Sequence, residues 1–306
     1  MHNKLLMSLI GLVCFGSFAF GQAGVPAPSK YEFEIIQNVQ GNVTITRYTQ
    51  NKTEIVIPSQ IEGVEVSEIG EGAFSGKGLT SVTLPAGLRA IGKNAFSNNR
   101  LLNVSIPASV RSIGDSAFAG NQLLSITIPP SVTSIGNSAF SNNLLLSITI
   151  PDSVTFIGDA AFLSNQLTSI TLPAGLRSIA NGVCARNKLT TITIPASVTS
   201  IGDGAFASNQ LRIVTIPTSV RSIGRGAFID NPLERIDLPD SVTNIGNDAF
   251  TIDELTSITL AANMVETLIT KTYIVFEISF INYYISQNQK AGTYIKTGRI
   301  WSIKRQ

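Results

Sequence analysis

Residues 145–162 read LLSITIPDSVTFIGDAAF, and residues 189–206 read LTTITIPASVTSIGDGAF. The same pattern returns every 22 residues along the middle of the chain, and each copy ends in an Ala-Phe pair or its equivalent. The closing residues of these copies are Phe74, Phe96, Phe118, Phe140, Phe162, Cys184, Phe206, Phe228 and Phe250. A fixed period in this range is typical of a solenoid, in which each unit covers its neighbours and none folds alone. The sequence therefore predicts nine 22-residue units without insertions.

Each unit contains the signature of a short strand. Leu145, Ile148 and Ile150 follow a Leu-x-x-Ile-x-Ile pattern, and Pro151 comes directly after it. The final alternation of isoleucine and threonine predicts a half-buried strand, which the proline ends because it lacks an N–H donor. A second short strand is predicted at 132–135, followed by a glycine that permits a backbone bend. Polar residues after the glycine are predicted to cap a helical turn: Asp115, Asn137, Asp159 and Asp203.

Seven asparagines form a column, each placed two residues before a core leucine. They are Asn99, Asn121, Asn143, Asn165, Asn187, Asn209 and Asn231. Buried backbone polar groups need partners, and a stacked amide can bond its own loop and the backbone of the next loop. We therefore interpret the column as a structural asparagine ladder. The alternative, a metal or substrate site, would need converging acids or histidines instead of amides in file.

The unit resembles a leucine-rich repeat, whose pattern is Leu-x-x-Leu-x-Leu-x-x-Asn. The version with Ser-Val-Thr-Ser-Ile-Gly-x-x-Ala-Phe is similar to the BspA-like family of oral anaerobes and treponemes, over about residues 55–262. The resemblance implies a mainly β leucine-rich-repeat solenoid with a parallel strand ladder. It also implies an exported surface protein, since several members of that family act in attachment to host matrix proteins or to other bacteria.

A solenoid must close both of its ends. Residues 31–36 and 43–48 alternate apolar and polar side chains around a glycine, which predicts an N-terminal β-hairpin. Residues 275–288 space their apolar side chains for one helix face, and 291–295 and 299–303 flank a turn. We therefore expect a C-terminal cap of a helix plus a β-hairpin. The rings of this cap serve either as a cover for the last unit or as an aromatic ligand platform.

The first residues carry the layout of an export signal. Lys4 precedes the apolar stretch 5–20, and small residues at Ala19 and Gly21 suit a cleavage site. The stretch is about 16 residues long, shorter than the roughly 20 residues that span a bilayer, which disfavours an uncleaved anchor. A lipoprotein cut before Cys14 is disfavoured by a bulky residue in front of it. The predicted organisation is signal peptide 1–21, N-terminal cap 22–64, solenoid 65–262 and C-terminal cap 263–306.

Composition excludes several kinds of chemistry. The 306 residues include 22 Lys+Arg, 20 Asp+Glu, one His and two Cys. The near balance of charge argues against a nucleic-acid partner. His2 lies in the predicted signal, so a mature chain has no histidine for a catalytic triad or a zinc cluster. A paired-carboxylate hydrolase stays open from acid content alone, although the acids are scattered. We predict no enzyme, no cofactor, no metal and no small-molecule substrate.

Cys184 stands where the other units place phenylalanine. In the same unit Val183 replaces the usual alanine and Ala180 replaces the usual glycine, so added methyl groups refill part of the space of the ring. We predict a buried and unreactive thiol. The alternative is a reactive thiol that forms an intermolecular disulfide. If the thiol is buried, this unit should be the least stable, because a residual cavity costs stability.

One outward-facing column of the strand departs from the small polar residues found elsewhere. Directly after the core leucine, three consecutive units carry a second leucine. With strands about 4.8 Å apart, these leucines lie within about 10 Å. Contiguous apolar surface with a polar rim often marks a protein-binding site; the alternative is neutral drift of the repeats. The candidate protein-binding residues are Leu102, Leu124, Leu144, Leu146, Thr127 and Thr149.

Two functions are compatible with these features. The first is an adhesin, an exported module that binds host matrix proteins or other bacteria through the strand face. The second is a structural or scaffolding protein of the envelope or periplasm without a host ligand. The predicted location is secreted or at the cell surface after cleavage near Gly21, with the outer membrane or periplasm as alternatives. A charged group at Arg212, Glu234, Arg235 and Asp237 marks the far end of the face and could orient a partner.

Overall fold

The computed structural model describes residues 32–250, 255–260, 287, 291–297 and 300–303. These residues form strands and turns but no helix, and hence no helix that is long and apolar enough to cross a membrane. The strands are β1 (Phe33–Gln37), β2 (Val43–Tyr48), β3 (Glu54–Val56), β4 (Gln60–Ile61), β5 (Val64–Ile69), β6 (Ser81–Thr83), β7 (Ala90–Ile91), β8 (Ser112–Ile113), β9 (Ser134–Ile135), β10 (Ser147–Thr149), β11 (Phe156–Ile157), β12 (Ser169–Thr171), β13 (Ser178–Ile179), β14 (Ser200–Ile201), β15 (Ile213–Thr215), β16 (Ser222–Ile223), β17 (Arg235–Leu238), β18 (Asn244–Ile245), β19 (Ser257–Leu260), β20 (Gly292–Thr297) and β21 (Ile300–Ile303).

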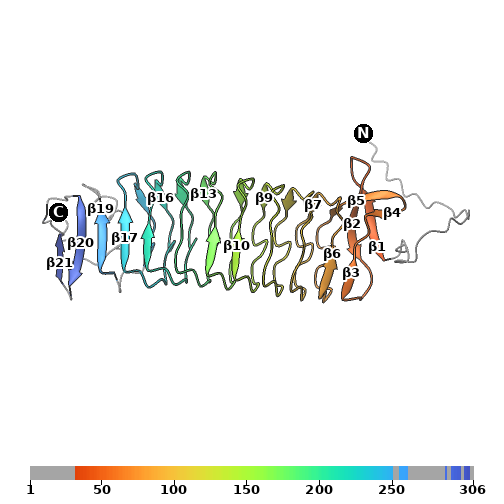
Figure 1. Ribbon diagram of the computed structural model, residues 1–306, viewed down its shortest axis with the longest axis horizontal. Coiled ribbons are helices and arrows are strands. Elements are labelled where there is room, and N and C mark those ends of the chain that lie inside the picture. Colours follow the sequence, from red (N-terminus) through yellow and green to blue (C-terminus); the bar gives the residue numbers. More distant parts are fainter. Residues whose placement is uncertain (1–31, 251–254, 261–286, 288–290, 298–299, 304–306) are drawn as a thin grey trace, which may run out of the picture.

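The units stack as successive turns of an elongated solenoid (Figure 1). Strands β6, β10 and β17 lie along one long edge in this view, and β7, β9, β13 and β16 lie along the other. Partner strands are parallel and one unit apart, so that Ser147 pairs with Ser169 and Ser200 pairs with Ser222. The predicted mainly β solenoid with parallel strands is confirmed.

The first strands of the units pair in three separate sheets instead of one continuous sheet. β3 pairs with β6, β10 pairs with β12, and β17 pairs with β15 and β19, while Ser105 and Thr127 form an isolated bridge. Residues 191–194 form no strand, and residues 101–106 and 123–128 form only the isolated bridge, so the prediction of a strand in every unit is wrong in these three units. These first strands are three or four residues long, and a proline follows each of them within two residues except β19, so neighbouring strands share few backbone hydrogen bonds.

The second strand of the unit gives two parallel ladders. Strands β5, β7, β8, β9 and β11 continue one sheet, while β13, β14, β16 and β18 form another. The break falls between β11, in the unit that closes at Phe162, and β13, in the unit that contains Ala180 and Cys184. We call this break the seam.

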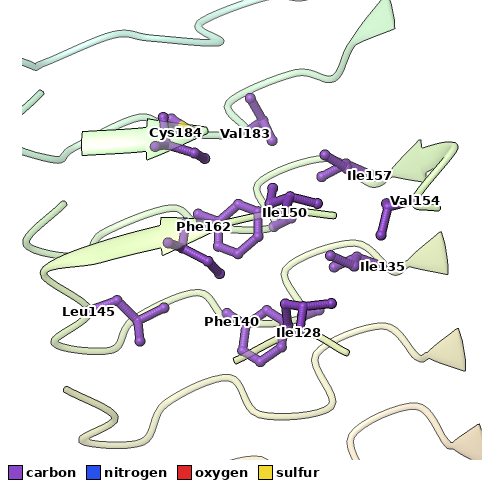
Figure 2. Packing of buried hydrophobic residues seen from close by; sticks show 14 of the residues in the cluster. Ile128, Ile135, Phe140, Leu145, Ile150, Val154, Ile157, Phe162, Val183 and Cys184 are labelled. Atoms are coloured by element: carbon purple, nitrogen blue, oxygen red, sulfur yellow. The ribbon is translucent and has the colours of Figure 1, made fainter. Parts of the chain in front are cut away.

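The core is a column of stacked rings beside aliphatic side chains. The rings from Phe74 to Phe162 stack with centroids 5.0–5.7 Å apart, and the rings from Phe206 to Phe250 stack at 5.4 Å. Tyr48 extends the column at the N-terminal end, 5.4 Å from the ring of Phe74. Figure 2 shows two of these rings, with Val183 and Cys184 on the following turn. The ring column runs through the middle of the solenoid because the closing pair of each unit points inward.

The glycine after the second strand is required by space. A Cβ atom on Gly136 would lie 2.5 Å from the backbone nitrogen of Asp115 in the preceding turn. On Gly246 it would lie 2.4 Å from the nitrogen of Arg225. Neither glycine has a positive φ. The expectation that Gly136 serves a backbone bend is therefore wrong: the turns approach so closely that no side chain fits between them.

The segment after this glycine is a tight turn. In every unit the residue two positions before the closing Phe or Cys lies in the left-handed region, which interrupts a right-handed helix. These residues are Gly72, Asn94, Ser116, Ser138, Ala160, Gly182, Gly204, Gly226 and Asp248. The predicted helical turn, and with it the helix-capping role of Asp115, Asn137, Asp159 and Asp203, is wrong.

The same polar side chains instead link neighbouring turns. Asp115 Oδ1 accepts the backbone N–H of Asn137 at 2.7 Å, and Asn137 Oδ1 accepts that of Asp159 at 2.8 Å. The pattern continues through Asn181 to Asp203, whose Oδ1 accepts the N–H of Arg225 at 2.7 Å. Aspartate and asparagine alternate along this row, which keeps like charges from occupying adjacent turns.

Both ends of the solenoid carry antiparallel strands. β1 pairs with β2, which confirms the predicted N-terminal hairpin. β19 pairs with β20, and β20 pairs with β21, which confirms the C-terminal hairpin. Tyr294 of β20 is fully buried opposite Ile258 of the last turn. The predicted helix at 275–288 lies outside the described residues except for Gln287, and the predicted signal at 1–21 lies wholly outside them.

Candidate protein-binding surface

The seven asparagines are buried and bonded across the turns. Asn143 Nδ2 donates to the carbonyl oxygens of Phe118 at 2.9 Å, Phe140 at 3.1 Å and Ser141 at 3.2 Å. Its Oδ1 accepts the N–H of Leu123 at 3.1 Å. The amide thus joins its own turn to the preceding turn, whereas the sequence indicated the next one. The other members of the column repeat these contacts: Asn99, Asn121, Asn165, Asn187, Asn209 and Asn231.

Four leucines are exposed on the strand face. The exposed fractions are 48% for Leu102, 50% for Leu124, 41% for Leu144 and 57% for Leu146. The N–H of Leu124 donates to the carbonyl of Leu102 at 3.1 Å, and that of Leu146 donates to the carbonyl of Leu124 at 3.4 Å. Three of the leucines therefore stand side by side on consecutive turns. We call the four residues together the leucine surface.

Short polar side chains border the leucine surface. Thr127 and Thr149 are exposed one strand position beyond the buried isoleucines. Ser125 and Ser147, directly after the exposed leucines, are also exposed. Because these side chains are small, the leucines are the most prominent apolar groups on this part of the face.

Cations flank the leucine surface. Arg100 is exposed just before the first leucine-bearing strand segment, and Arg186 and Lys188 are exposed two units beyond the last. These three cations form no ion pair within the part of the chain that the structure describes. The segments 100–106, 122–128, 144–150, 166–172 and 188–194 contain no acidic residue. Along the solenoid axis this stretch is apolar over the three turns from Leu102 to Leu146, with Arg100 on the first of these turns and Lys188 two turns past the last.

The charges at the far end pair with one another. Arg212 contacts Glu234, and Arg235 binds Asp237 through two hydrogen bonds of 3.0 and 2.9 Å. The sequence placed these four residues together correctly but could not show that their charges are already matched. They have less charge to offer a partner than the unpaired cations beside the leucines.

Sequence reasoning missed five exposed apolar residues: Ile36, Val39 and Val56 near the N-terminal end, and two within the repeats. Phe156 on β11 and Ile213 on β15 are each 55% exposed. Phe156 occupies a column that holds serine in the neighbouring units, as at Ser134 and Ser178. Comparing columns residue by residue would have found both. Phe156 lies on the second ladder and Ile213 lies beyond the leucine surface, so neither extends it.

The second ladder carries a shallow polar depression of about 350 Å³. Asp159, Asn181 and Asp203 line it together with Ser200 and Ser222. The Oδ1 atoms of the first three accept backbone N–H groups of the following turns. Among the described residues, no three His, Cys, Asp or Glu side chains are grouped to hold a metal ion.

Cys184 is fully buried, as the column of phenylalanines predicts. Burial raises the pKa of its thiol to about 12, because the thiolate would lose its hydration in an apolar core. Because the folded protein holds this proton more tightly than the unfolded chain, the thiol contributes fully to the free energy of unfolding below about pH 8.5. This contribution is lost as the pH rises toward 12.

We expect Cys184 to resist alkylation in the folded protein. The thiolate is the reactive form, and both its low population at pH 8 and the burial of the sulfur protect it. The measurement is mass spectrometry of the peptide that contains Cys184 after treatment with iodoacetamide, with and without 8 M urea as an added denaturant. Modification only in urea is the expected result. Rapid modification of the native protein would contradict the buried position.

Comparisons with known proteins agree with this architecture. A family model described as the BspA type leucine rich repeat region matches residues 46–168 and 177–294, in six copies. The chain is similar to a leucine-rich repeat protein of solved structure from Bacteroides ovatus, with 30% identity and a TM-score of 0.66. That match covers 76% of this chain and 64% of the Bacteroides protein, so this chain spans less than two thirds of its length.

Two further solved structures are more distant. A leucine-rich repeat protein of T. pallidum is 25% identical, with a TM-score of 0.46 over 75% of this chain and 90% of its own. A leucine-rich cell surface protein of Faecalibacterium prausnitzii is 23% identical, with a TM-score of 0.34 over 82% of this chain and 100% of its own. No curated protein sequence matches the chain.

Proposed function

Because this chain belongs to the BspA-type leucine-rich repeat family, we propose that it is an exported protein-binding module that works at the cell surface. Its partners are host matrix proteins or the surface proteins of other bacteria, and it attaches to them through the strand face. The leucine surface is the observation that carries the proposal. A leucine-rich-repeat solenoid acts through its extended surface, so no catalysis is assigned to it.

The leucine surface has the composition of an interface centre. Leu102, Leu124 and Leu146 keep about half of their surface in contact with water, next to one another and within a polar rim. Covering the exposed half of one leucine contributes about 1 kcal/mol at roughly 25 cal/mol per Å². Three leucines together therefore contribute about 3 kcal/mol, or about a 100-fold effect on affinity.

Changing Leu102, Leu124 and Leu146 together to threonine is expected to weaken attachment at least 10-fold. The substitution removes exposed apolar area, while other units already place threonine in this column, as at Thr168 and Thr190. The fold should therefore be retained. The measurement is binding of the purified full chain to surfaces coated with matrix proteins and to whole bacteria, with circular dichroism to check the fold.

Phe156→Ser is the matched control. It removes an equally exposed apolar side chain from the second ladder, where neighbouring units already carry serine. Attachment should be unchanged. Equal attachment by the folded triple variant and the unchanged chain would remove the leucine surface as the site. Protease treatment of intact cells tests the location: a protected chain would favour the envelope scaffold over the adhesin.

A further inference from the structure

The three leucines of the column repeat at nearly the spacing of helical turns. Backbone hydrogen bonds connect Leu102 to Leu124 and Leu124 to Leu146, so they follow a strand spacing of about 4.8 Å. An α-helix rises about 5.4 Å per turn, and its residues i, i+3 or i+4, and i+7 span about 10.5 Å along one face. The three leucines span about 10 Å. A helix along the solenoid axis can thus place one apolar residue against each leucine.

A β-strand in the same position fits less well. Residues on one face of a strand recur about every 6.6–6.8 Å, so a strand along the axis falls out of register by the third leucine. A strand laid across the axis would meet one leucine and then the short side chains of the same unit, such as Ser125 and Thr127. Neither orientation uses the three leucines together.

The width of the surface also suits a helix. The apolar stripe of an amphipathic helix is about two residues wide, with positions i, i+3, i+4 and i+7. Leu144 supplies an apolar contact beside the main column, at a position where the neighbouring units carry Gln122 and Gln166. On the other side, Ser125 and Ser147 are too short to hold a helix away from the leucines.

The flanking cations define the charge of the partner. Arg100 and Lys188 lie in the same column of the repeat four units apart, about 19 Å at the strand spacing. A helix of about 13 residues covers that distance at 1.5 Å per residue. Since no acidic residue lies on the strand segments between these two cations, carboxylates on the partner would meet unpaired positive charge at both ends.

We infer that the leucine surface binds an amphipathic α-helix of the partner protein, lying along the solenoid axis, with a leucine-type stripe and acidic residues toward its ends. This inference rests on the proposed function, because it names the class of protein segment that the strand face recognises. The leucines contact the helix over the three turns that begin with the turn of Arg100, and Lys188 meets it two turns beyond Leu146.

Four synthetic peptides of equal length test the inference against the full chain. The first carries leucines at i, i+3, i+4 and i+7 with glutamates near both ends. The second has the same composition in scrambled order, the third has a central proline, and the fourth has lysines in place of the glutamates. Fluorescence anisotropy should show the first peptide binding at least 10-fold more tightly than the other three. Its affinity should fall as salt is raised.

Variants of the protein make the test specific. The Leu102, Leu124 and Leu146 to threonine variant should lose at least 10-fold in affinity for the first peptide, while Phe156→Ser should bind it unchanged. Arg100→Glu combined with Lys188→Glu should weaken the glutamate peptide and strengthen the lysine peptide. That reversal of preference would arise from charge recognition and not from loss of the fold.

The outcomes separate the inference from the proposed function. If the scrambled or the proline peptide binds as tightly as the first peptide, the inference that the partner segment is a helix is overturned. If the threonine variant loses attachment to matrix proteins or bacteria while no peptide binds, the inference of a helical partner is wrong and the proposed attachment through the strand face is supported. If attachment is also unchanged, both are wrong. If the full chain self-associates in solution and the threonine variant does not, while no peptide binds, the occupant is a second copy and the helix is again overturned.

Discussion

Asn143→Ala is expected to lower the free energy of unfolding by about 2–4 kcal/mol. The buried amide donates to the carbonyls of Phe118, Phe140 and Ser141 and accepts from the N–H of Leu123. Alanine leaves the N–H of Leu123 without an acceptor, and a buried unsatisfied polar group costs about 1–3 kcal/mol. The three carbonyls each lose one bond but keep a second donor: Asn121 Nδ2 for Phe118, Asn165 Nδ2 for Phe140 and the N–H of Gly120 for Ser141. Water entering the vacated space recovers part of the loss. The measurement is urea unfolding followed by circular dichroism.

Asn103→Ala is the control for this prediction. Asn103 is exposed on the strand face, so its replacement should change stability by less than about 0.5 kcal/mol. Equal unfolding midpoints for the Asn143 and Asn103 variants would mean that the asparagine column does not hold the turns together. A loss confined to the Asn143 variant would mean that neighbouring turns depend on its amide.

The fold could be predicted because each physical requirement recurs at the same place in every unit. A core leucine such as Leu123, a strand-ending proline and a ring such as Phe118 each fix one column of the solenoid. The reason for Gly136 could not be predicted, because it depends on a 2.5 Å approach between turns that are far apart in sequence. The bonds of Asp115 were missed for the same reason, since its partner lies one turn away.

The candidate surface was predictable in part. The exposure of Leu124 follows from the alternation of buried and exposed positions along the strand, which the sequence shows directly. The pairing of Arg212 with Glu234 depends on side-chain conformation, which no repeat pattern encodes. Likewise Ala180 is visible as an irregular residue, but its effect emerges only once the glycine column is known to touch the preceding turn.

That effect is the seam between β11 and β13. The N–H of Gly158 donates to Ile135 at 2.9 Å, and the N–H of Gly202 donates to Ile179 at 2.8 Å. Among the described residues, the equivalent backbone bond from Ala180 to the turn before it is not formed. On the equivalent glycines, from Gly92 to Gly246, a Cβ atom would lie 2.4–2.7 Å from the preceding turn. The methyl group of Ala180 does not fit in so close an approach, and we attribute the missing bond to it.

The ring column is interrupted in the same unit. Cys184 separates Phe162 from Phe206, so the stack of aromatic rings is divided into two parts. Val183 is buried where the neighbouring units carry alanine, as at Ala161 and Ala205. Figure 2 shows Val183 and Cys184 on the turn that follows Phe162. The closing segments still bond across the seam, as from the N–H of Phe162 to the carbonyl of Val183 at 2.9 Å. Because the turns of a solenoid support only their neighbours, the bonds lost in the second ladder still weaken the coupling between the two halves.

Restoring the consensus of this unit is expected to stabilise the protein by about 3 kcal/mol. The triple variant Ala180→Gly, Val183→Ala and Cys184→Phe returns the close approach of the turns and refills the ring column. Losing a buried phenylalanine costs about 3–5 kcal/mol in cores, so its return should regain a similar amount less any remaining strain. Urea unfolding should show a higher midpoint, and hydrogen exchange should show stronger protection of β11 and β13.

The single variant Cys184→Phe distinguishes two causes of the seam, the missing ring and the added methyl groups. With Val183 and Ala180 still present, the ring has too little room, so this variant should be no more stable than the unchanged chain. The gain of the triple variant would then exceed the sum of its parts, as expected for residues in contact. A full gain from Cys184→Phe alone would mean that the missing ring, and not the methyl groups, opens the seam. The reverse transplant, Gly158→Ala, Ala161→Val and Phe162→Cys, should create a second seam and destabilise the chain by a similar amount.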